Sequence, residues 1–383
     1  MSRAPHRTTF RRAGRHASRG MTLIEISVAT ALSLVVLTAI LFAFLSQRST
    51  QRYAQELAQV QGNGRVALEQ IGRDIRQAGF IGCNSALQRH VDPRVWETAV
   101  IPVDPAVAVS NSNFTIDAQT SIRAFVGNSG ADVWGSAAPA GVPAASHVIE
   151  VRYASLDGAT RLDPGVAITP LTLTTLGTFE PSRGDVTPQS SNRLALLSDC
   201  QSAVVVSIAS ISGTAIDIMP TRPLSGARCG HASRIGSGCL YAPSTTLYPI
   251  RVVQYFVAVQ TMDGITQPSL MMRTRRMSST AVEWEDPQEL LRGVTDLTVT
   301  GLGLDLPRAA GSDPTFTARR QLDEITDGAA FLPAVTSTEW QRVVRVDLRL
   351  RMQASKGTQV GDAPVIRNFE SSYTIRSRVT VDP

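Results

Sequence analysis

One uninterrupted apolar segment near the N-terminus constrains this chain more than any other feature. Residues 26–45 contain no charged side chain. An α-helix rises about 1.5 Å per residue, so a helix over this segment would be about 30 Å long, the thickness of the hydrocarbon core of a bilayer. The sequence therefore predicts one membrane-spanning helix ahead of a long C-terminal body that runs to residue 383.

The positive charge of the chain is concentrated ahead of this segment. The chain has 37 Lys and Arg residues against 32 Asp and Glu residues, a formal net charge of +5. Six of the arginines lie in residues 1–20, which contain no acidic residue, so the remainder is close to neutral. The positive-inside rule places this basic leader in the cytoplasm and the C-terminal body outside it. The near-neutral body gives no electrostatic reason to expect nucleic acid as a partner.

Two simple kinds of N-terminus are alternatives for the apolar segment, and only the second fits it. A cleaved secretory signal has a shorter apolar segment and a small-x-small cleavage site, whereas this segment ends in Leu45-Ser46-Gln47-Arg48. A plain signal anchor fits the composition, and Glu25 would then only mark where the span begins. A carboxylate in a membrane helix is costly, however, so Glu25 is also a candidate functional residue.

The residues around Glu25 resemble a known processing signal. The string Arg19-Gly20-Met21-Thr22-Leu23-Ile24-Glu25 resembles the class III signal of type IV pilins and type II secretion pseudopilins. The resemblance implies that a prepilin peptidase cleaves between Gly20 and Met21 and that Met21 is then N-methylated, although the family usually has phenylalanine at that position. It also implies that Glu25 pairs with the Met21 amine of a neighbouring subunit and so sets the assembly register. A pair within one chain stays open, because Met21 and Glu25 are four residues apart.

The helical pattern continues beyond the span. Apolar residues three or four positions apart predict one buried stripe, formed by Leu57, Val60, Gly64, Leu68, Ile71, Ile75 and Ala78. We expect the helix to bend or soften at Gly62-Asn63-Gly64, because each glycine lowers helix stability by about 1 kcal/mol relative to alanine, and to end at Gly79.

The second half of this helix resembles a narrower family. The ordered motifs Asn63-Gly64-Arg65, Arg73-Asp74-Ile75-Arg76, Ala78-Gly79-Phe80 and Gly82-Cys83 resemble the corresponding segment of PilW-family type IV pilus assembly proteins. Residues 367–379 resemble the ending of the same family. Pseudopilins of the J class share the Arg-Asp-hydrophobic-Arg part but are usually shorter.

Downstream the apolar period changes to two, which predicts β-strands. The clearest strand is Arg342 to Met352, with one apolar and one charged face, as in a half-buried antiparallel strand. Met262-Asp263-Gly264 is a hairpin signal. Further strands are predicted at His147–Ala154, Arg193–Leu197, Ala203–Ile208, Thr214–Met219, Arg251–Val259, Ser269–Arg275, Val294–Thr300 and Tyr373–Val379.

The predicted fold is therefore α+β, with a long N-terminal helix packed on a mainly antiparallel sheet with long loops. Its parts are a cleaved leader at 1–20, a transmembrane or fibre-core helix at 21–45, an amphipathic continuation at 46–79 and a β-rich periplasmic domain at 80–383.

The four cysteines predict disulfides, because their number is even and the body is expected outside the cytoplasm. Three connectivities are open. Cys229 and Cys239 are close in sequence and are paired here, which leaves Cys83 with Cys200. A zinc site that includes His231 competes, but its spacing does not match closed zinc sites, so we expect no metal.

No enzyme is expected from the sequence. It contains no G-x-S-x-G, H-E-x-x-H, P-loop or G-x-G-x-x-G motif, and we expect no cofactor. His90 and His147 are expected to be structural or solvated.

The resemblance implies a minor pilin that helps to prime type IV pilus assembly and is incorporated at or near the tip, after passing through the inner membrane. Its implied partners are other minor pilins, the major pilin, the prepilin peptidase and the inner-membrane assembly platform, with a large tip adhesin as a further candidate. Two alternatives remain open: a minor pseudopilin of a type II secretion system, and a signal-anchored periplasmic binding domain.

Overall fold

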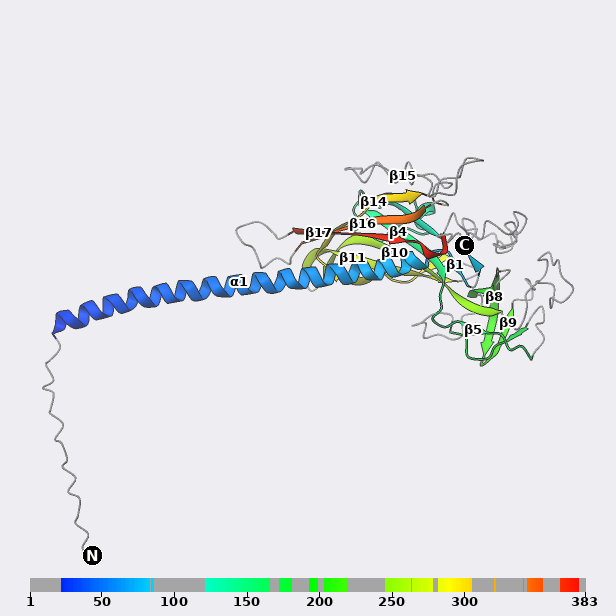
Figure 1. The fold of residues 1–383 in the computed structure, drawn as a ribbon, viewed down its shortest axis with the longest axis horizontal. Helices are drawn as coiled ribbons and strands as arrows, with labels where there is room; N and C mark the ends of the chain where they lie inside the picture. The colour runs from blue at the N-terminus through cyan, green and yellow to red at the C-terminus, as the bar shows by residue number, and fades with distance from the viewer. Residues whose placement is uncertain are drawn as a thin grey trace, which may run out of the picture. The chain divides into compact units, whose positions relative to one another are not determined.

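The computed structural model of this chain describes residues 22–82, 84–85, 121–165, 172–180, 193–198, 203–218, 245–262, 264–277, 282–304, 320–321, 340, 343–353 and 366–378. It has one long N-terminal helix followed by antiparallel β-sheets, so the predicted α+β class is confirmed (Figure 1). The chain divides into two compact units, Met1–Gln55 and Glu56–Pro383.

The long helix, α1 (Leu23–Gln77), continues without a break through Gly62-Asn63-Gly64, where the sequence predicts a bend or a soft joint (Figure 1). The predicted stripe is confirmed, since Val60, Leu68, Ile71, Ile75 and Ala78 are buried. The helix ends just before Gly79, which has a φ of 71° and donates its N–H to the carbonyl of Arg152. A glycine at that backbone conformation is the expected stop for a helix.

The remaining elements are mostly strands. In chain order they are β1 (Phe80–Ile81), β2 (Asn84–Ser85), β3 (Ile122–Val126), α2 (Ala131–Trp134), β4 (His147–Ala154), β5 (Thr160–Arg161), β6 (Thr172–Thr174), β7 (Arg193–Ser198), β8 (Ala203–Ser212), β9 (Ala215–Ile218), β10 (Thr246–Met262), β11 (Ile265–Met277), β12 (Val282–Trp284), β13 (Gln288–Arg292), β14 (Val294–Leu304), β15 (Arg320–Gln321), β16 (Val343–Gln353), β17 (Ile366–Thr374) and the 3-10 turn η3 (Arg376–Arg378).

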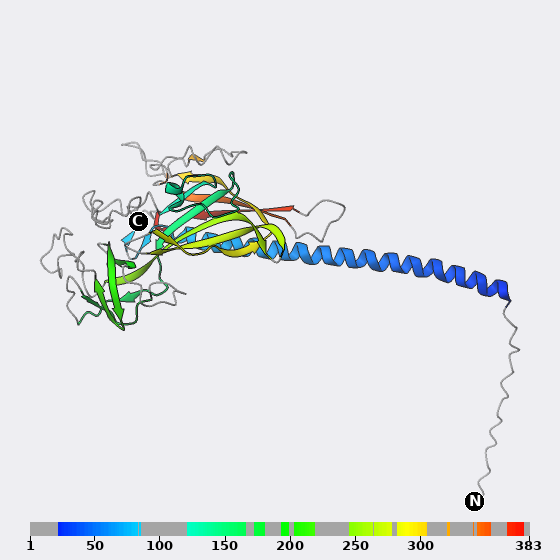
Figure 2. The same ribbon diagram turned by 180° about the vertical axis from the view of Figure 1, so that it is seen from behind.

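The largest sheet is organised around β10. The C-terminal part of β10 pairs with β4 and β11, and β3 extends the sheet beyond β4. The N-terminal part of β10 pairs with β5 and β7 and leads through β8 and β9 to β6. One long strand therefore belongs to two lobes of the same sheet. The lobe that contains the green strands β5, β8 and β9 lies apart from β4, β14, β16 and β17 (Figures 1 and 2).

A second sheet has the order β15-β14-β16-β17. Together with the β3-β4-β10-β11 part of the first sheet, it encloses the C-terminal turns of α1 in one apolar core, which includes Leu68, Ile71 and Ile75 from the helix. The two sheets are joined by a buried contact in which the N–H of Val299 donates to Nδ1 of His147 at 2.9 Å. The expectation of a structural role for His147 is confirmed by this bond.

Most predicted strands are found with small shifts at their ends. The predicted hairpin is also confirmed, because Met262 pairs with Ile265. The strand predicted at Tyr373–Val379 is wrong: β17 ends at Thr374 and a 3-10 turn follows. The short strands β3, β5, β6, β12 and β13 and the helix α2 are not predicted, because segments of two to five residues carry little periodicity.

Candidate functional site

The N-terminal end of α1 bears one of the three predicted processing and assembly residues. Gly20 and Met21 lie outside the described residues. Thr22 precedes the first helical residue, and its hydroxyl accepts the N–H of Glu25 at 3.3 Å. Thr22 thus caps the helix, and Glu25 in the first turn is well placed for the positive end of the helix dipole. The cap was missed in the sequence, although Thr-x-x-Glu before an apolar run is its signal.

The first half of α1 has a surface suited to surroundings without water. Fourteen large apolar side chains between Leu23 and Leu45 are exposed, with none of the span buried within the chain. The helix is long and apolar enough to cross a membrane once. No other helix among the described residues meets that test.

The polar groups of this span are satisfied within the helix. All four hydroxyls of residues 26–45 donate to backbone carbonyls three or four residues earlier, at 2.7 to 2.9 Å: Ser27, Thr30, Ser33 and Thr38. Such bonds remove the need for water at these side chains. The first charged side chain after the span, Arg48, lies 4.4 Å from the centroid of the Phe44 ring.

The second half of α1 is fixed to the sheet by a buried carboxylate. Asp74 accepts hydrogen bonds from the hydroxyl of Tyr153 on β4, at 3.0 Å, and from the hydroxyl of Tyr255 on β10, at 2.7 Å. Burial raises the pKa of Asp74, and the two hydroxyls partly offset this effect. Burial, together with the nearby Asp74 carboxylate, raises the pKa of both tyrosines, so each hydroxyl keeps its proton and acts as a donor.

Two aromatic rings of β17 also lie against α1, each over a glycine. A Cβ atom on Gly64 would lie 2.7 Å from the Phe369 ring, and one on Gly72 would lie 2.0 Å from the Tyr373 ring. The Tyr373 hydroxyl donates to the carbonyl of Leu68 at 2.7 Å. Glycine is therefore needed at both positions because a strand approaches closely, not because the helix bends.

The spacing of these two contacts follows from the geometry of the elements. Eight helical residues from Gly64 to Gly72 span about 12 Å, and four strand residues from Phe369 to Tyr373 span about 13 Å. The two repeats match, so β17 runs along α1 in the same direction as the helix. Local periodicity predicts the helical stripe but not this match, because the two segments are about 300 positions apart in the chain.

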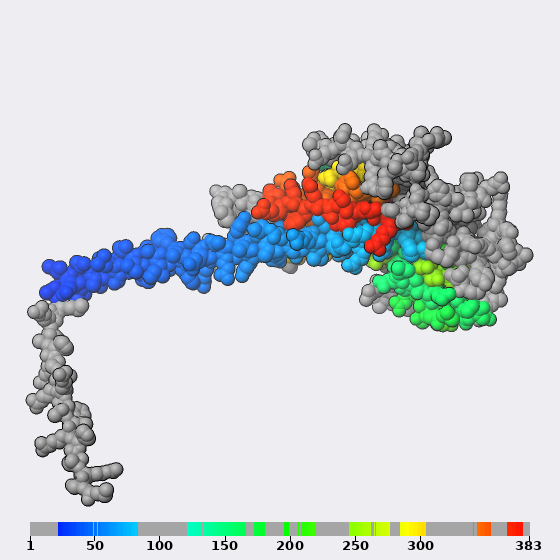
Figure 3. Space-filling model, viewed as in Figure 1, coloured from blue at the N-terminus to red at the C-terminus, as the bar shows by residue number. Residues whose placement is uncertain are grey.

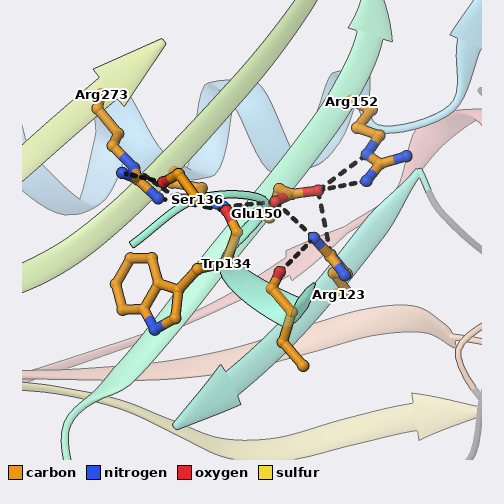
Figure 4. Close-up of polar contacts among 8 residues, drawn as sticks. Arg123, Trp134, Ser136, Glu150, Arg152 and Arg273 are labelled. Carbon is orange, nitrogen blue, oxygen red and sulfur yellow. Dashed lines mark hydrogen bonds and ion pairs between the residues drawn. The ribbon is translucent and has the colours of Figure 1, made fainter. Parts of the chain in front are cut away.

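The face of the sheet that points away from α1 carries a row of polar residues across four strands. Arg123, Glu150, Gln254 and Arg273 are direct cross-strand neighbours on β3, β4, β10 and β11. Both Arg123 and Arg152 form ion pairs with Glu150, at 2.9 and 2.7 Å (Figure 4). The side-chain amide of Gln254 also donates to Glu150, at 2.6 Å. Burial would raise the pKa of Glu150, but the charges of Arg152 and Arg123 outweigh it and hold the pKa at about 2.

The same row holds the segment between β3 and β4 against the sheet. Arg273 donates to the carbonyl of Trp134 and to the hydroxyl of Ser136, and Arg123 donates to the carbonyl of Val133 (Figure 4). The Arg273 guanidinium also lies 4.9 Å from the Trp134 ring and 4.3 Å from the Trp284 ring. This arrangement orders the buried face of the sheet that points away from α1.

The four cysteines of the predicted disulfides, Cys83, Cys200, Cys229 and Cys239, lie outside the described residues, as do His90 and His231. Within the described part of the chain, no group of three or more His, Cys, Asp and Glu side chains is arranged to hold a metal ion.

We compared the chain with known protein families, curated proteins and solved structures. No protein-family model, curated protein or solved structure matches this chain.

Proposed function

We propose that this protein is a pilin-type subunit, a minor pilin that helps to prime assembly of a type IV pilus and enters the fibre at or near its tip. One observation carries the proposal. A single unbroken helix has a first half whose apolar side chains are exposed and whose hydroxyls are bonded internally, and a second half that is buried in an antiparallel sheet. The first half suits a bilayer and later the packed helices of a fibre, and the second half suits a folded domain outside the cytoplasm.

The N-terminal residues would carry the processing and assembly steps. Cleavage between Gly20 and Met21 would leave an α-amine at Met21, with a reference pKa of about 7.7–8.0. An amine and the Glu25 carboxylate at the end of an apolar helix are both costly while unpaired, so their pairing between subunits would favour one axial register. The energy and the order of assembly would come from partners: the prepilin peptidase, an inner-membrane platform and the other pilins.

The decisive experiment is the intact mass and N-terminal sequence of the full chain from native membranes, with and without the prepilin peptidase of the host. We expect a chain that begins at Met21 in normal cells and retains residues 1–20 in the peptidase mutant. A chain that keeps residues 1–20 in normal cells would contradict the proposal and leave a membrane-anchored periplasmic domain.

The role of Glu25 is tested by Glu25→Val, with Thr38→Val as the matched control in the same span. We expect both variants to be cleaved and only Glu25→Val to impair piliation, because Thr38 bonds only within its own helix. Normal piliation in Glu25→Val would contradict the register role. Deletion of the gene decides between pilus and secretion machinery: loss of twitching motility is expected, whereas loss of protein export alone would assign the chain to a type II secretion system.

A further inference from the structure

The strand β17 differs from the other strands that pair along one side only. Among the described strands, these others are two to five residues long: β1, β2, β3, β5, β6, β12, β13 and β15. By contrast, β17 has nine residues, all paired with β16 in one continuous register without a bulge. Native proteins usually protect an edge of this length with charged side chains, a proline, a bulge or a covering element. Residues Ile366–Thr374 contain no proline and no bulge, and their charged side chains are Arg367 and Glu370 alone.

The direction of the open backbone groups follows from the antiparallel pattern. Ile375 donates its N–H to the carbonyl of Val344, one position beyond the last pair of β16 and β17. In an antiparallel pair, alternate residues bond to the partner strand. The odd-numbered residues of β17 therefore bond to β16, and the even-numbered ones direct their N–H and C=O groups to the open edge.

These even-numbered residues are accessible. Asn368, Glu370, Ser372 and Thr374 are all exposed, whereas Phe369 and Tyr373 face α1. No backbone hydrogen bond from these four residues to an element other than β16 occurs within the described part of the chain. The space-filling view shows β17, in red, at the surface directly beside the α1 turns that it covers (Figure 3). The open edge thus lies along the helix and runs in the helix direction.

We propose that this edge pairs with an extended strand from a different pilin-type subunit, which carries a basic residue opposite Glu370. This inference rests on the proposed function, because a neighbour whose helix packs alongside α1 would meet the edge lengthwise. A second copy of this chain fits less well. Self-pairing of the full strand about its centre would place Glu370 opposite Glu370, and like charges directly opposite destabilise a sheet.

The backbone pattern supplies a substitution that separates pairing from folding. Ser372→Pro removes an N–H that points to the open edge and leaves every bond to β16 in place, and proline is tolerated on such an edge. Ser372→Thr keeps the N–H and is the matched control. Asn368→Pro has the same parity as Ser372→Pro and replaces it if that variant is unstable. The thermal unfolding midpoint of each full-length variant in detergent shows whether it remains folded.

The readout is photo-crosslinking in native membranes of the full chain with benzoylphenylalanine at the exposed Thr374, which leaves Glu370 in place, and at the exposed Leu156 as a control position. We expect an adduct at position 374 with a chain that the same prepilin peptidase cleaves, identified by mass spectrometry. Ser372→Pro should lower its yield by about tenfold or more, the equivalent of about 1.4 kcal/mol, and Ser372→Thr should leave it unchanged.

Three results would overturn the strand inference while leaving the proposed function intact, provided that the protein is cleaved at Gly20 and found in sheared fibres. They are the absence of an adduct, an adduct with a second copy of this chain, and an adduct that a folded Ser372→Pro variant forms equally well. A chain that is never cleaved would instead contradict the proposed function, and this inference would fall with it.

Discussion

The two faces of the β3-β4-β10-β11 sheet each bury a carboxylate, and they treat it in opposite ways. On the helix side, Asp74 receives two neutral tyrosine hydroxyls and its pKa is raised by burial. On the other side, Glu150 receives two guanidinium groups and an amide, and its pKa is about 2 despite complete burial. The surroundings on the helix side therefore disfavour the ionised form of Asp74, and those on the other side favour the ionised form of Glu150.

The difference reflects what each carboxylate holds in place. Asp74 lies within an apolar helix–sheet interface. The two tyrosine hydroxyls orient its carboxylate by hydrogen bonds and add no further charge to the buried interface. Glu150 is the centre of a charged row that orders the segment around Trp134, and it compensates arginines that are themselves buried. Helix docking thus depends mainly on shape and hydrogen-bond direction, whereas the outer face depends on charge balance.

The largest effect on this contrast is expected from Glu150→Gln. The substitution leaves Arg123 and Arg152 without their shared counter-charge, and removal of one partner from a buried ion pair typically costs about 3–5 kcal/mol. We expect a loss of this size in the free energy of unfolding of the full chain in detergent, measured by denaturant titration.

The matched control is Glu69→Gln. Glu69 pairs with Arg76 at 3.0 Å and its own side chain is 58% exposed, so loss of this pair should cost less than about 1 kcal/mol. Equal effects of the two substitutions would show that burial of the Glu150 pairs does not matter.

A smaller effect is expected on the helix side, from Gly72→Ala. The added Cβ would overlap the Tyr373 ring, which the bond to the Leu68 carbonyl holds in place, and overpacking of this kind costs about 1–3 kcal/mol. The matched control is Gly62→Ala in the same helix, where a Cβ would meet no atom within 4 Å. That change should stabilise the protein by about 0.5–1 kcal/mol through helix propensity. If both glycines behaved alike, close approach of β17 would not be what requires Gly72.

These glycines also show how far the sequence alone could lead. The apolar stripe of α1, the class of the fold and most strands were predictable because they depend on periodicity within short windows. The packing of Phe369 and Tyr373 against the two glycines was not predictable, because it depends on a contact between segments that are distant in the sequence. Helix propensity predicts a weak point at a glycine, whereas the need for space at Gly64 and Gly72 follows only from the position of β17 beside them.

The two buried carboxylates show the same limit. Asp74 belongs to the Arg73-Asp74-Ile75-Arg76 motif, but its partners Tyr153 and Tyr255 are on strands whose alignment does not follow from local periodicity. Glu150 lies inside a correctly predicted strand, but its burial on the face away from α1 contradicts a simple alternation of buried and exposed residues. Its signal would have been the arginine two positions later together with charged residues on the neighbouring strands.

The contrast can finally be sharpened by the pH dependence of stability, with effects of at most about 1.4 kcal/mol per pH unit for each group. Glu150 has a lowered pKa in the folded protein, so its contribution is present above about pH 4.5 and is lost as the pH falls toward 2. Asp74 has a raised pKa, so its contribution is present below about pH 3.8 and is lost as the pH rises through the raised value. Relative to Glu150→Gln, the wild type should therefore gain stability between pH 2 and 4.5, whereas relative to Asp74→Asn it should lose stability as the pH rises above 3.8. Unfolding free energies of the three proteins at matched pH values test this prediction. If the stability difference between wild type and variant changed with pH in the same direction for both carboxylates, the hydroxyl donors and the guanidinium donors would not distinguish the two faces.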